Sequence, residues 1–129
     1  LQKQVVAKTS VELTINGADG KRAVRNAETN LGDLCADAYR ILLGAVIAFV
    51  NGGGVRDNIK VGDITYGDMI KVHPFGNEAC LVEVTGQQIK DALELGSAAY
   101  PGESGGFLQV SGLTYTINAD IPQLRCKER

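Results

Sequence analysis

Apolar residues recur at helical spacing along one long segment, residues 27–44. The pattern predicts an amphipathic helix with a single buried stripe. That stripe consists of Leu31, Leu34, Cys35, Ala38, Ile41 and Leu42. Thr29 or Asn30 is a suitable N-cap, and Asp33 lies where the helix dipole favours a negative charge. Gly44 stands where a left-handed residue commonly ends a helix.

Two shorter helices are expected further along the chain. One opens at Asp63 or Thr65 and is stopped by Pro74, because the residue before a proline avoids helical geometry. The other is expected in TGQQIKDALELGS, residues 85–97. Its opening threonine and the glutamine three positions later match a capping box.

Four segments are predicted to be strands, three from alternating apolar and polar positions and one, AVIAFV, as a short β-branched apolar run bounded by glycine that is typical of a buried strand. These are residues 11–15, 45–50, 78–86 and 107–117. The turn residues NGADG are expected to lead from the first strand into a second short strand, KRAVR. SAAYPGESGG, in contrast, has the composition of a flexible loop. The order of elements predicts a mixed α/β domain in which helices pack on a sheet.

Composition adds limits rather than a function. The 129 residues suggest one domain, residues 1–129, with room for a core. The net charge of −2 gives no sign of a nucleic-acid partner, and no apolar run approaches the roughly 20 residues of a membrane span. The N-terminus lacks the apolar core of a signal peptide, so either the protein is cytosolic or the sequence begins inside a longer precursor.

Cysteine and histidine are sparse. Cys35, Cys80 and Cys126 are spaced too widely for a zinc-binding pattern. We interpret Cys35 and Cys80 as small apolar groups. His73 is the only histidine, so a histidine-rich metal cluster is excluded. A lone histidine is more often a packed or surface residue than a ligand.

The segment NGGGVR carries the first candidate chemistry. It follows an expected buried strand, at a position where α/β proteins often bind ligands. Adjacent glycines expose backbone N–H groups, and Arg56 offers a forked pair of donors to phosphate or carboxylate. Asn51 both donates and accepts, as recognition of a base or sugar edge requires. The alternative is a tight glycine turn with a surface arginine.

Two further segments add candidates. Phe75 lies between a proline and a glycine, outside any helix or strand stripe. Its ring is either a stacking face for a base or a plug at the helix end. Arg25 precedes the long helix and could face an anion near its N-terminus. No nucleophile and base pair is recognisable, which indicates a binding domain without catalytic machinery.

Three segments in this order resemble one family. They are ETNLGDLCADAYR (28–40), FVNGGGVRDNIKVGDITYGDMIKVHPFGN (49–77) and LVEVTGQQIKDAL (81–93). Together they strongly resemble the C-terminal domain of the 5′-nucleotidases, which include UDP-sugar hydrolases and 2′,3′-cyclic-nucleotide phosphodiesterases. GGFLQVSGLTYTI (105–117) extends the similarity. NGGGVR followed by HPFGN at this distance is a specific signature.

The resemblance implies a substrate site that recognises a nucleotide or nucleoside. Its residues here are Arg25, Asn51, Gly53, Gly54, Arg56, Phe75, Gly76 and Asn77. Arg56 resembles an arginine that binds the phosphate or ribose side, and Phe75 one of two aromatic residues that sandwich the base. Asn51 resembles a base-contacting asparagine, and Arg25 a substrate-binding arginine. The glycines line the pocket because they lack side chains.

In the family the hydrolysis belongs to an N-terminal metallophosphoesterase domain, against which the C-terminal domain rotates. That domain holds two divalent metal ions through DxH, GDxxD and GNHE motifs, and none of these motifs occurs here. The resemblance therefore implies no cofactor in this chain and an extracellular, periplasmic or cell-surface location.

One part of the family pattern is missing. The second sandwiching aromatic lies near a GGDG motif, which this sequence lacks, so we expect a domain that is incomplete at its C-terminal end. The alternative function is a stand-alone α/β module that binds a ligand or a partner without catalysis.

Overall fold

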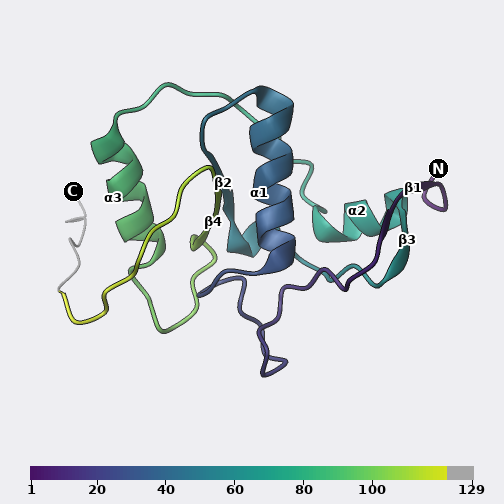
Figure 1. Ribbon diagram of the computed structural model, residues 1–129, viewed down its shortest axis with the longest axis horizontal. Coiled ribbons are helices and arrows are strands. Elements are labelled where there is room, and N and C mark those ends of the chain that lie inside the picture. The colour runs from purple at the N-terminus through teal and green to yellow at the C-terminus, as the bar shows by residue number, and fades with distance from the viewer. Residues whose placement is uncertain (122–129) are drawn as a thin grey trace.

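Residues 1–121 are described by the computed structural model, and they form helices and two small antiparallel sheets (Figure 1). The elements in chain order are β1 (Val5–Thr9), α1 (Asn30–Leu43), β2 (Ala48–Asn51), the 3₁₀ turn η1 (Gly52–Gly54), β3 (Gly62–Thr65), α2 (Tyr66–Val72), α3 (Gly86–Gly96) and β4 (Leu108–Ser111). One sheet pairs β1 with β3, and the other pairs β2 with β4. The predicted class of helices packed on strands is confirmed, with two small sheets in place of one.

The long helix α1 begins and ends where its sequence predicts. The Thr29 hydroxyl accepts a hydrogen bond from the Gly32 amide at 3.1 Å, which satisfies one of the free donors of the first turn. Gly44 adopts a left-handed φ of 63°, and its N–H bonds the carbonyls of the last turn. Local capping therefore determines the extent of this helix.

The buried face of α1 differs from the predicted stripe. Leu31 and Cys35 are buried as expected, but four of the predicted core residues are exposed. These are Leu34, Ala38, Ile41 and Leu42. The face that packs on β2 and β4 instead contains Gly32 and Ala36, and a Cβ on Gly32 would lie 2.3 Å from Gln109 Oε1. Small residues thus set the close approach between helix and sheet.

The sheet of β2 and β4 lies at the centre of Figure 1, beside α1. Ala48 pairs with Ser111 and Asn51 with Leu108, in antiparallel register. The strand predicted over residues 45–50 is thus confirmed in part. The strand predicted over residues 107–117 ends early, because Gly112 takes a φ of +83° directly after β4.

Three strand predictions fail. Residues 11–15 form one isolated bridge, from Leu13 to Ile59, and KRAVR forms another, from Arg22 to Asn16. Residues 78–85 are extended and exposed but pair with nothing in the described part of the chain. The sheet of β1 and β3 was not expected at all, because its exposed residues show no amphipathic alternation.

The two shorter helices confirm their predictions. Thr65 and Asp68 form a capping box at the start of α2, and His73 ends it directly before Pro74. Thr85 and Gln88 form a second capping box at the start of α3. In residues 1–121, no helix is long and apolar enough to cross a membrane.

Candidate functional site

The glycine loop is shaped by the protein's own backbone. The Gly52 amide donates to the Phe107 carbonyl at 2.7 Å, and the Gly53 amide donates to the Gly105 carbonyl at 3.0 Å. A Cβ on Gly52 would lie 1.9 Å from the Val24 carbonyl oxygen, and one on Gly53 would lie 2.9 Å from Gly105. These two glycines are therefore required by neighbouring backbone, whether or not a ligand binds.

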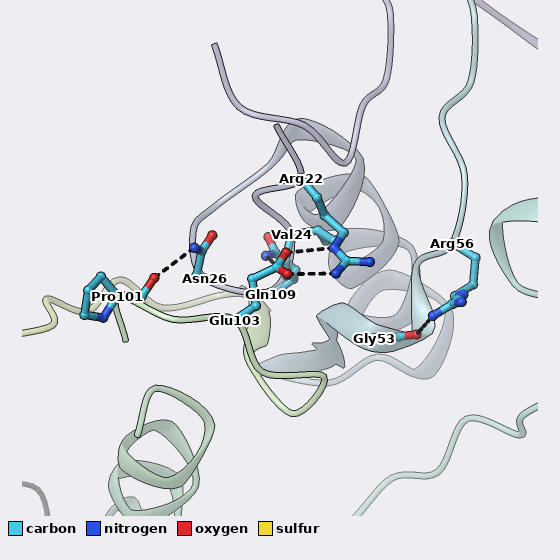
Figure 2. A network of polar contacts seen from close by, with 8 residues as sticks. All are labelled: Arg22, Val24, Asn26, Gly53, Arg56, Pro101, Glu103 and Gln109. Carbon is cyan, nitrogen blue, oxygen red and sulfur yellow. Dashed lines mark hydrogen bonds and ion pairs between the residues drawn. The ribbon is translucent and has the colours of Figure 1, made fainter. Parts of the chain in front are cut away.

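Gln109 holds the segment that carries Arg25. Its amide nitrogen donates to the Val24 carbonyl at 3.0 Å (Figure 2). The same nitrogen donates to the Ala27 carbonyl at 2.7 Å, and the side-chain oxygen accepts from the Thr29 amide at 3.2 Å. The side chain is only 2% exposed, so these bonds replace all contact with water. Gln109 could not be assigned from the sequence, because a polar position in a short strand is ordinarily taken to face solvent.

The loop before β4 was predicted to be flexible, but several contacts hold it against the Arg25 segment. Arg22 forms a two-pronged ion pair with Glu103, with both bonds at 2.7 Å. Asn26 donates to the Pro101 carbonyl at 3.1 Å (Figure 2). The Ser104 amide donates to the Arg25 carbonyl at 2.9 Å. These contacts join residues about 80 positions apart, so no local spacing in the sequence could indicate them.

Arg56 and Phe75 meet at the open side of the glycine loop. The Arg56 amide donates to the Val72 carbonyl at 3.0 Å, which attaches the loop to the end of α2. The guanidinium donates to the Gly53 carbonyl at 3.3 Å, and its central carbon lies 5.7 Å from the centre of the Phe75 ring. This is a cation–π distance. Phe75 is 59% exposed, so its ring is not a plug in the core.

The arginines near the glycine loop differ in whether a carboxylate compensates their charge. Hydrogen bonding to Arg22 lowers the pKa of the Glu103 carboxyl, and the nearby charge of Arg25 lowers it further. The positive charge of Arg22 is therefore compensated by the carboxylate of Glu103. The Arg25 side chain forms no hydrogen bond or ion pair with any residue that the structure describes. Arg25 and Arg56 are therefore the cations best placed to receive an anion.

The structure brings most of the predicted site residues into one cluster. Asn51 donates to the Gly105 carbonyl at 3.1 Å, so its side chain is tied to the same loop that contacts Gly53 and Arg25. Asn51, Gly54 and Asn77 also line one apolar groove beside β2. The contact of each predicted residue with a substrate, including Gly54, Gly76 and Asn77, stays a prediction.

The cysteines and the histidine take structural positions. Cys35 is buried against His73, with 3.2 Å between Sγ and Nε2. Burial raises the pKa of the Cys35 thiol to about 11 and lowers that of His73, so the pair is neutral at pH 7. The prediction of a small apolar role is wrong for Cys80, which is exposed, while Cys126 lies outside the described residues. No group of three His, Cys, Asp or Glu side chains within residues 1–121 could hold a metal ion.

Comparison with known proteins decides the family. A family profile described as "5′-nucleotidase, C-terminal domain" matches residues 5–125. The chain belongs to this family. This chain is 46% identical over 104 residues to the trifunctional nucleotide phosphoesterase protein YfkN of Bacillus subtilis. It is also 42% identical to a 5′-nucleotidase of Vibrio cholerae and 34% identical to protein UshA of Escherichia coli. These matches cover 77%, 75% and 84% of the chain.

A solved structure supports the same assignment. The crystal structure of a 5′-nucleotidase precursor from Thermus thermophilus superimposes on 94% of this chain with a TM-score of 0.84 and 39% identity. This domain spans only 24% of that protein and between 7% and 20% of the three relatives above. The activities in their names are those of longer proteins.

Proposed function

We propose that this domain recognises the nucleotide substrate of a metal-dependent 5′-nucleotidase. The observation that carries the proposal is the pair of Arg56 and Phe75 at the open side of the glycine loop. The pair offers a flat apolar face and a cation within one site, as a base joined to a phosphate requires. The names of the relatives, which include 5′-nucleotidases, favour the same substrate class.

Each side chain has a part that suits its surroundings. The exposed ring of Phe75 stacks on the base, and Arg56, oriented by the Gly53 carbonyl, binds the ribose or phosphate side. Arg25, which has no ion pair among residues 1–121, binds the phosphate. The amide nitrogen of Asn51 is engaged by Gly105, which leaves its carbonyl oxygen to accept from an amino group on the base.

The hydrolysis itself belongs, in this proposal, to a metallophosphoesterase domain outside these residues. Two divalent metal ions held there would activate a water and stabilise the charge on the phosphate. Residues 1–121 do not fit a metal site, since they contain no group of three His, Cys, Asp or Glu side chains that could hold an ion. We place the parent protein outside the cytoplasm, by the family resemblance. The isolated chain should not hydrolyse AMP in the presence of divalent metal ions.

The test is a titration of the ¹⁵N-labelled chain with AMP and with adenosine, followed by NMR. We expect shifts to cluster at residues 51–56 and 72–77. Phe75→Ala should weaken the binding of both AMP and adenosine by about 1–3 kcal/mol, the usual value of one base-stacking contact. Arg56→Ala should weaken the binding of AMP more than that of adenosine, because only AMP carries a phosphate for the guanidinium to contact.

Lys60→Ala is the matched control, because it removes an exposed cation outside the cluster. It should leave both affinities unchanged. Shifts that avoid these two segments, or equal losses from Lys60→Ala and Arg56→Ala, would contradict the proposed site. In that case the stand-alone binding module becomes the better explanation.

A further inference from the structure

Glu103 brings a negative charge close to Arg25, one of the two cations that we expect to receive an anion. The Ser104 amide, next in the chain, donates to the Arg25 carbonyl at 2.9 Å, so the two side chains start from adjoining backbone. The Arg25 side chain nevertheless forms no ion pair with any residue among 1–121. A carboxylate beside an arginine competes with a phosphate for the same N–H donors. The position of the Glu103 carboxylate therefore matters to the site.

Arg22 holds that carboxylate in one direction. Its Nε donates to Oε1 of Glu103 and its Nη2 donates to Oε2, both at 2.7 Å (Figure 2). This two-pronged arrangement engages both carboxylate oxygens with a single guanidinium. The carboxylate can turn toward Arg25 only by breaking both of these bonds.

Attachment of the loop does not explain the ion pair. Side chains that are 44% and 38% exposed gain little stability from pairing. The same loop also has four hydrogen bonds to the residues around the site. They join Ser104 to Arg25, Asn26 to Pro101, and the Gly105 carbonyl to both Gly53 and Asn51. The loop should therefore stay in place without Arg22, and what Arg22 adds is control over the direction of the carboxylate.

We propose that Arg22 is a positioning residue that keeps the Glu103 carboxylate away from Arg25 and so leaves Arg25 available to a phosphate. The inference rests on the proposed function, in which Arg25 binds the phosphate of the nucleotide. Without Arg22, the carboxylate turns to Arg25 and competes with the ligand. Arg22 thus raises phosphate affinity through two other residues, without touching the ligand itself.

A double-mutant cycle separates this effect from a simple loss of positive charge. AMP affinity is measured by ¹⁵N NMR titration for the unaltered chain, Arg22→Ala, Glu103→Gln and the double variant. We expect Arg22→Ala to weaken AMP binding by about 5-fold, the equilibrium constant of a favourable exposed ion pair. In the Glu103→Gln background the same change should alter AMP affinity by less than about 2-fold, because only screened long-range attraction is then lost. Adenosine affinity should be equal in all four proteins, since adenosine lacks the phosphate.

The pair of Lys8 and Asp63 supplies the matched control. It is another exposed ion pair, with 3.3 Å between nitrogen and oxygen, and it joins the two strands of the sheet of β1 and β3. Lys8→Ala removes the same charge as Arg22→Ala and also leaves a carboxylate without its partner. AMP affinity should not change in this variant.

The pKa of the Glu103 carboxyl tests the proposal without any ligand. Hydrogen bonding to Arg22 is the main cause of its lowered pKa, and the charge of Arg25 contributes less. If the carboxylate turns to Arg25, its pKa stays low in Arg22→Ala and rises to the ordinary range only in Arg22→Ala/Arg25→Ala. A pH titration followed by ¹³C NMR of the glutamate carboxyl groups measures both variants.

Two results would overturn the proposal. One is an equal loss of AMP affinity from Arg22→Ala with and without Glu103. The other is a Glu103 pKa that returns to the ordinary range in Arg22→Ala alone. Failure of the proposed function gives a different result, since AMP and adenosine would then bind the unaltered chain alike. A Glu103 pKa that stays low in Arg22→Ala would still support its restraint by Arg22.

Discussion

Gln109 should contribute more to stability than any exposed polar side chain. Gln109→Met keeps the approximate volume but removes bonds to three backbone groups, those of Val24, Ala27 and Thr29. At about 0.5–1.5 kcal/mol for each net hydrogen bond, the loss is about 1.5–4.5 kcal/mol. The upper half of that range is favoured, because the site is buried and the partners are left without water.

Urea unfolding followed by circular dichroism measures this loss, with an unchanged denaturant slope as the check that the unfolding transition is comparable. Gln87→Met is the matched control, since Gln87 is exposed and its side chain bonds Asp91 of its own helix. It should cost less than about 0.5 kcal/mol. A Gln109→Met variant that loses no more than the Gln87→Met control would refute the reasoning.

Two further predictions concern the glycine loop and α1. Gly52→Ala should destabilise the fold strongly in urea unfolding, because its Cβ meets the Val24 carbonyl, whereas Gly86→Ala, with open space around its Cβ, should be neutral or stabilising. Equal effects of the two changes would contradict the steric explanation. The pKa of Asp33 is raised to about 6 by burial and by the neighbouring charge of Glu28. The folded state thus binds more protons than the unfolded state, and stability should fall as pH rises from 4 to 6. Asp33→Asn should remove that fall in urea unfolding between pH 4 and 7, and an unchanged profile would exclude this residue as its cause.

The helices were predictable because their ends depend on neighbouring residues. Thr29 and Gly44 bound α1, and the Thr85 capping box starts α3, all through bonds that span three or four positions. The strands were less predictable, since a strand needs a partner. Residues 78–86 have the alternation of a strand, yet none of the residues 1–121 pairs with them.

The residues of the candidate site also divide into those that local sequence assigns and those that depend on distant partners. Arg56 and Phe75 stand close enough in sequence, and in motifs specific enough, to be assigned together from the sequence. Glu103 and Gln109 could not be assigned, because their partners lie about 80 positions away. Nothing in the local pattern around Gln109 distinguishes a buried polar residue from an exposed one.

The sequence by itself determined the extent of the helices, the family and the candidate nucleotide-binding residues, because these depend on short segments and their order. Tertiary structure alone decided which face of α1 is buried, since Leu34 and Ile41 are as apolar as the residues chosen. It also decided why two of the three consecutive glycines are needed. Gly52 and Gly53 lie against the backbone of Val24 and Gly105, and that close approach exists only once distant segments have been brought together.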